Sequence, residues 1–147
     1  MAKVQNVSRH DIEVGNHIDS SRAVLIQISD PDSEHPQPAK SFVRAYQYKF
    51  LDIEDKDECL DPAWRFNNVQ ADEISIVLQL CRLLGYDVVV HCHMGVCRSG
   101  AIAECAEALG FKYAGNGKTP NQAVKTLLMK SLGLYIDESN SAFNSED

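Results

Sequence analysis

The sequence lacks the features of membrane, secreted and nucleic-acid-binding proteins. No apolar run approaches the roughly 20 residues that a membrane-spanning helix needs, and the opening MAKVQN lacks the apolar core of a signal peptide. The five cysteines are odd in number and lack the spacing of a disulfide framework, which favours a reducing compartment. The formal net charge of −7 disfavours nucleic acid as a partner. We therefore expect a cytoplasmic protein with neither a membrane nor a nucleic-acid partner.

The composition is typical of one globular domain. A chain of 147 residues, with 44% hydrophobic and 24% charged residues, is long enough and apolar enough to build a full hydrophobic core. The sequence contains no internal repeat and no sign of a second domain. We expect a single domain over residues 1–136, and we expect residues 137–147, which are acidic and rich in serine, to form a disordered tail.

Short apolar segments alternate with helical patterns along the chain. The β-branched runs 23–29 and 88–91 are typical of buried, parallel strands, and aromatic residues alternate through a third expected strand, 41–51, on what we expect to be one face. Capping residues and apolar periodicity predict helices over residues 8–15, 68–84, 101–109 and 121–132. This pattern predicts an α/β fold with a small, mostly parallel central sheet flanked by helices.

The most informative segment joins the predicted strand 88–91 to the predicted helix 101–109. In it, five residues separate Cys92 from Arg98. A strand–loop–helix gathers backbone N–H groups and the positive end of a helix dipole around one point, which favours an anion and the thiolate form of a cysteine. An arginine there can bind two phosphate oxygens at once. The loop therefore predicts phosphoryl transfer through a cysteinyl-phosphate intermediate. The residues expected to bind the phosphate or sulfate anion are His93, Met94, Gly95, Val96, Cys97 and Arg98.

The pattern His91-Cys92-x5-Arg98-Ser99, with Gly95 inside, resembles the signature of the cysteine-based protein tyrosine and dual-specificity phosphatases. The resemblance covers about ten residues. It implies that Cys92 is the nucleophile, that Arg98 binds the phosphate, that Ser99 helps the thiolate leave in the second step, and that His91 stabilises the thiolate. It also implies a protein tyrosine phosphatase-like fold and a phosphorylated protein or peptide as substrate, with no metal and no other cofactor.

The reaction also needs a carboxylic acid that protonates the leaving oxygen. Residues 51–58 hold five acids among eight residues, and the resembling family carries its aspartate on a movable loop in this part of the chain. We favour Asp52, because it directly follows the predicted strand. Asp55 and Asp57 are the alternatives and Asp61 is a more remote one, and the sequence leaves the order among them open.

Two further segments yield expectations about structure. Residues 30–38 hold three prolines and three acids, which predicts an irregular loop with His35 in solvent. We expect the last helix to begin with Thr119 as its N-cap and Pro120 as its first residue. The Pro120-Asn121 opening is similar to that of small bacterial- and phage-type members of the phosphatase family.

Other functions fit parts of the same pattern. A phosphate-binding pseudo-phosphatase would keep the loop and lack a well-placed acid. A rhodanese-like or arsenate-reducing thiol enzyme would use Cys97 or Cys81 as a resolving cysteine. A metal site built on His91, Cys92, His93 and Cys97 is disfavoured, because these residues lack the paired spacing of zinc ligands.

Overall fold

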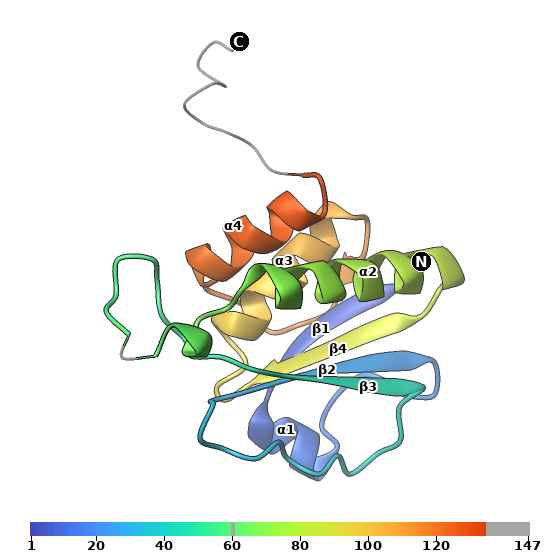
Figure 1. Cartoon of the computed structure of the whole chain (residues 1–147). Helices are drawn as coiled ribbons and strands as arrows, with labels where there is room; N and C mark the ends of the chain where they lie inside the picture. The colour runs from blue at the N-terminus through green and yellow to red at the C-terminus, as the bar shows by residue number, and fades with distance from the viewer. Residues whose placement is uncertain (60, 135–147) are drawn as a thin grey trace.

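The computed structural model describes residues 1–59 and 61–134, which form an α/β fold around one parallel sheet (Figure 1). The strands are β1 (Lys3–Ser8), β2 (Ala23–Ser29), β3 (Arg44–Lys49), β4 (Asp87–Cys92) and β5 (Lys112–Tyr113), and they lie in the order β3-β2-β4-β1-β5. All four neighbouring pairs are parallel, and β4 is the central strand. The predicted α/β fold with a small, mostly parallel sheet flanked by helices is confirmed. The predicted tail, 137–147, lies outside the described residues.

Helices cover both faces of the sheet. Figure 1 shows α1 (Arg9–Val14) on one face and α2 (Asn68–Leu84), α3 (Arg98–Ala108) and α4 (Gln122–Ser131) on the other. Ser8 and Asn67 begin α1 and α2 with capping boxes, and Gly15 and Gly85 end them with φ angles of 77° and 76°. No helix within residues 1–59 and 61–134 has the length and apolar character needed to cross a membrane.

The core consists of two apolar clusters, one on each face of the sheet. Because successive side chains of a strand point to opposite faces, Leu25 and Val89 join the cluster under α1, whereas Ile26 and Val90 join the larger cluster under the other three helices. Residues 23–26 of β2 and 88–90 of β4 are therefore apolar on both faces of the sheet. This double burial holds β4, and with it the loop that follows, in a fixed place.

The structure corrects several expectations about the elements. The strands β1 and β5 were not predicted, because β1 includes polar side chains and β5 has only two residues. The strand expected over 41–51 is shorter, and Phe42 packs with the cluster under α1, at 5.2 Å from the ring centroid of His17, rather than with the other aromatic residues. The N-cap of α4 is Asn121 and not Thr119, since Asn121 Oδ1 accepts a hydrogen bond from Val124 N at 3.0 Å.

Candidate functional site

The parallel sheet brings the predicted site residues to one edge. Cys92 is the last residue of β4, and the loop that follows it leads to Arg98, the first residue of α3. Since all strands run in the same direction, the segments that follow β1, β2 and β3 start at this same edge. Ligands of open α/β folds bind at the carboxyl ends of the strands, so the fold places the predicted phosphate loop where a binding site is expected.

Four carbonyl oxygens of the loop after Cys92 point away from the centre of the loop and accept hydrogen bonds from neighbouring segments of the protein. The bonds run from Arg9 N to His93 O (3.2 Å), from Asn6 Nδ2 to Gly95 O (2.8 Å), from Thr119 N to Val96 O (3.2 Å) and from Asn121 N to Cys97 O (3.0 Å). Each planar trans peptide points its N–H away from its carbonyl. The N–H groups of Met94, Val96 and Cys97 therefore point away from these bonded carbonyls, toward the inside of the loop, and have no acceptor among the described residues, so an anion can bind there.

Gly95 allows the loop to pack against the end of β1. Its φ angle is +76°, and a Cβ atom at this position would lie only 2.5 Å from Ser8 N, so a side chain fits neither the conformation nor the space. Asn6, which is buried in β1, supports the same turn by donating to Gly95 O and accepting from Tyr113 Oη at 2.6 Å. The sequence analysis missed Asn6, because no strand was expected there.

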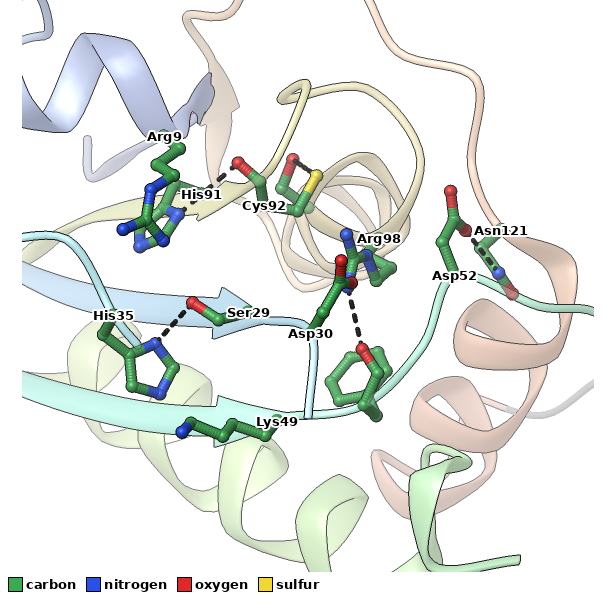
Figure 2. A network of polar contacts seen from close by, with 12 residues as sticks. Arg9, Ser29, Asp30, His35, Lys49, Asp52, His91, Cys92, Arg98 and Asn121 are labelled. Carbon is green, nitrogen blue, oxygen red and sulfur yellow. Dashed lines mark hydrogen bonds and ion pairs between the residues drawn. The ribbon is translucent and has the colours of Figure 1, made fainter. Parts of the chain in front are cut away.

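Arg98 is 4% exposed and is held by one side of its guanidinium group. Its Nη1 donates to Asp30 Oδ1 at 2.7 Å (Figure 2) and to Phe50 O at 2.8 Å. Its Nε and Nη2 bond to no described residue, and Nε is buried. Nε–H and Nη2 form the edge of the guanidinium group opposite Nη1. That edge remains available for two parallel hydrogen bonds to an oxyanion.

Asp30 is a second site residue that the sequence analysis missed. It directly follows β2, the strand beside β4, yet it stands in a loop that was expected to be irregular and solvated. Its carboxylate pairs with the buried guanidinium of Arg98. The available signal was its position, one residue after a strand that neighbours the strand of Cys92.

Cys92 and Ser99 contact each other at the start of α3. Both residues are buried, and Cys92 Sγ lies 3.1 Å from Ser99 Oγ. Cys97, the N-cap residue of α3, makes no side-chain capping bond. The first N–H groups of α3 are therefore not satisfied by a cap, and together with the helix dipole they favour negative charge beside Cys92.

His91 supports the base of the loop as a neutral side chain. It is fully buried, and its Nδ1 lies 3.5 Å from the carbonyl oxygen of Cys92, to which it can only donate. Burial lowers the pKa of His91 to about 4, so the imidazole is uncharged at neutral pH. The neutral His91 adds no positive charge to the site, whereas the buried Arg98 does.

Of the four predicted candidates for the general acid, Asp52 is the one that reaches the loop. Its Oδ1 accepts a hydrogen bond from Asn121 Nδ2 at 2.8 Å (Figure 2). Burial, together with contact with this carboxylate, raises the pKa of the Cys97 thiol. The role of Asp52 as an acid stays a prediction, and its expected position beside the loop agrees with the structure.

The other three candidates have different surroundings. Asp55 lines a cavity of about 110 Å³ on the α4 side, together with Arg65 and Phe66. Asp57 Oδ2 accepts from Glu54 N at 2.7 Å, within its own segment. Asp61 accepts from Ala63 N at 3.0 Å and caps the short helix Pro62–Trp64. None of these contacts involves the loop after Cys92.

Two further expectations concern His35 and the resolving cysteine. His35 is not simply solvated, because it is half-buried and its Nδ1 lies 2.7 Å from Ser29 Oγ (Figure 2). Burial lowers the pKa of His35. Cys81 lies on the buried face of α2, in the core, and burial raises its pKa to about 11. A resolving role for Cys81 would therefore need a large change in the packing of α2.

A scan against protein-family models finds no match to this chain, and neither does a search of curated proteins. Among residues 1–59 and 61–134, no three His, Cys, Asp or Glu side chains are grouped as ligands for a metal ion. The function is therefore inferred from the loop after Cys92 and from the side chains around it.

Proposed function

We propose that the protein is a phosphate monoester hydrolase that acts through a cysteinyl-phosphate intermediate. The substrates would be phosphotyrosine or mixed phosphoprotein substrates, as in the protein tyrosine and dual-specificity phosphatases that the sequence resembles. One observation carries the proposal. Four carbonyl oxygens of the loop after Cys92 are bonded to the surrounding protein, which leaves N–H groups of the loop free, and the Nε–Nη2 edge of Arg98, the residue that ends the loop, is free as well.

The binding step uses the loop and Arg98. The phosphate dianion accepts hydrogen bonds from the inward N–H groups and two more from Nε and Nη2 of Arg98. Asp30 and the Phe50 carbonyl hold the opposite side of the guanidinium group, so little side-chain entropy is lost when the anion binds. This arrangement is ready for a trigonal transition state, whose charge lies on the three equatorial oxygens.

The first chemical step transfers the phosphoryl group to Cys92. The sulfur atom attacks phosphorus in line, and the S–P bond forms as the bond to the leaving oxygen breaks. Asp52 donates its proton to that oxygen, so that an alcohol or phenol leaves rather than an alkoxide or phenoxide. Asp52 accepts from the uncharged amide of Asn121 and contacts no cationic side chain among the described residues.

The second step releases phosphate. Asp52, now ionised, takes a proton from water, and the water oxygen attacks phosphorus while the S–P bond breaks. Ser99 Oγ, at 3.1 Å from Cys92 Sγ, donates a hydrogen bond to the departing thiolate. The reaction ends with the free thiolate, inorganic phosphate and protonated Asp52, ready for the next cycle. A reactive thiol of this kind persists best in a reducing compartment, and we place the protein in the cytoplasm.

The test is turnover of p-nitrophenyl phosphate and of a phosphotyrosine peptide. We expect the wild-type protein to release phosphate from both and Cys92→Ser to release none, while Cys92→Ser still binds the peptide. Cys59→Ser is the matched control and should keep wild-type rates, because Cys59 contacts Asp61 and no residue of the loop. Wild-type turnover that survives in Cys92→Ser would contradict the proposal.

Parallel assays separate the alternatives. Tight phosphopeptide binding without turnover of either ester would favour a binding module. Turnover of thiosulfate or arsenate in place of phosphate esters would favour a thiol-transfer or arsenate-reducing enzyme.

A further inference from the structure

We propose that Asn121 is a positioning residue that fixes Asp52 relative to the loop after Cys92. The inference rests on the proposed function, since it explains how Asp52, the proposed general acid, is held in position. It differs from the behaviour that the family resemblance implies, in which the aspartate moves in on a flexible loop. Here the buried Asn121 joins the two halves of the site, which are the loop after Cys92 and the segment that carries Asp52.

Asn121 contacts both halves at once. Its backbone N–H donates to Cys97 O at 3.0 Å, which ties it to the loop of the nucleophile. Its side-chain Nδ2 donates to Asp52 Oδ1 at 2.8 Å (Figure 2). The same Nδ2 donates to Ile53 O at 3.0 Å, so both bonds connect Asn121 to the segment of the acid. Asn121 is 3% exposed, so its side chain is fixed within the fold, whereas the carboxylate that it holds belongs to an exposed residue.

The acid segment is also joined to the first turn of α4. The two carboxylate oxygens of Glu54 accept from Gln122 N and from Ala123 N, both at 2.9 Å. Asn121 Oδ1 caps the next N–H, that of Val124. The free N–H groups that begin α4 are thus satisfied partly by the acid segment itself, and this gives the segment a rigid support.

Helix capping explains only one side of the Asn121 amide. The cap uses Oδ1, and serine would satisfy it as well. The Nδ2 group adds nothing to the helix, and both of its bonds go to the acid segment. An amide donor also suits a general acid, because it orients the carboxyl without placing a positive charge beside it.

Asn121→Ser therefore separates the two roles, because it keeps an N-cap oxygen and removes both Nδ2 bonds. On a phosphotyrosine peptide we expect kcat to fall by about tenfold or more, whereas on a substrate with a strongly acidic phenol as leaving group it should stay within about twofold. In Asp52→Asn, the further change Asn121→Ser should cost almost nothing, because the acid is already lost. Asn67→Ala, which removes the N-cap of α2, is the matched control: it should lower stability and leave the leaving-group dependence unchanged.

The outcomes are distinguishable. If wild-type protein turns over phosphate esters and Asn121→Ser keeps the wild-type leaving-group dependence, the positioning role is overturned while the proposed function stands. An equal loss on both substrates would also overturn it, since that pattern indicates a general structural defect.

A second readout does not depend on activity. In ¹⁵N-labelled protein, the side-chain amide signal of Asn121 should shift in Asp52→Ala and stay in place in Glu58→Ala, which removes an exposed acid of the same segment. If no ester is turned over, the proposed function fails, and this signal still decides whether Asn121 holds Asp52. An Asn121 signal that does not respond to Asp52→Ala would overturn the contact.

Discussion

Two aspartates stand at the same edge of the sheet and differ in what holds them. Asp30 follows β2 and accepts from the guanidinium of Arg98 at 2.7 Å. Asp52 comes a few residues after β3 and accepts from the amide of Asn121 at 2.8 Å. Asp30 therefore forms an ion pair, whereas the partner of Asp52 is an uncharged amide.

The difference indicates two roles for one residue type. Asp30 suits the orientation of Arg98, because it forms an ion pair with one side of the guanidinium group. Asp52 is the proposed proton donor, and the amide that holds it brings no positive charge. The partner of each carboxylate, rather than its distance from Cys92 along the chain, separates the two. The experiments below challenge this comparison, from the largest expected effect to the smallest.

The largest effect is expected for Asp52→Asn. Loss of a positioned acid should lower kcat on a phosphotyrosine peptide by about a hundred- to ten-thousand-fold. The loss should be much smaller with an acidic phenol as leaving group, and the acidic limb of the pH–rate profile should change shape. Steady-state kinetics over a series of aryl phosphates measures this. Equal losses across the series would remove Asp52 from the proton-transfer step.

A second effect concerns His91, and it tests whether this buried imidazole is uncharged in the folded protein. Burial lowers the pKa of His91 from 6.5 to about 4. Between these values the unfolded chain binds a proton that the folded protein does not. The free energy of unfolding should therefore decrease as the pH falls from about 6.5 to about 4, by roughly 3 kcal/mol for this group.

Urea denaturation between pH 7 and about 4.5 measures that dependence. Other groups titrate in the same range, so the comparison is with His91→Gln, which should lose the His91 part of the slope while it keeps the rest. Equal slopes in the two proteins would mean that His91 is charged inside the fold.

Asp30→Asn is expected to act on all substrates alike. The asparagine oxygen can still accept from Arg98, but the ionised partner is lost and the guanidinium group is held less firmly. We expect kcat/KM to fall by about tenfold for good and poor leaving groups, and inorganic phosphate to inhibit more weakly. A loss confined to poor leaving groups would show that Asp30, and not Asp52, is the proton donor.

The smallest effects are expected for Asp55→Asn and Asp57→Asn. Both side chains have contacts away from the loop after Cys92, so each variant should keep kcat within about twofold on every substrate. These variants are the controls for Asp52→Asn, because they change the charge of the same segment by the same amount. A leaving-group-dependent loss in either one, with normal Asp52→Asn, would mean that the segment must move to bring in a different acid.

Much of the fold and half of the site can be predicted from the sequence, for physical reasons. The β-branched runs of β2 and β4 and the Cys92-to-Arg98 spacing are local signals, and the structure places them as a parallel pair and a strand–loop–helix. The parallel edge also explains why an acid shortly after β3 lies beside the loop.

The remainder depends on contacts between distant segments. Asp30 and Arg98 are separated by 68 positions, Asn121 and Asp52 by 69, and Asn6 and Gly95 by 89. None of these pairs produces a periodic pattern in the sequence, since each member is a single residue whose partner is set by the order of the strands. Knowing that β2 and β1 flank β4 would have pointed to Asp30 and Asn6, because both lie beside the carboxyl end of the central strand.

The central claim is that a phosphoryl group passes through Cys92. The most direct test mixes wild-type protein with an excess of an aryl phosphate, quenches the reaction within milliseconds and maps phosphorylated peptides by mass spectrometry under conditions that preserve S–P bonds. We predict phosphate on Cys92, in an amount that rises in Asp52→Asn with an activated substrate, because that variant cannot activate the water of the second step. Phosphate release without any phosphorylated Cys92 in either protein would contradict the claim.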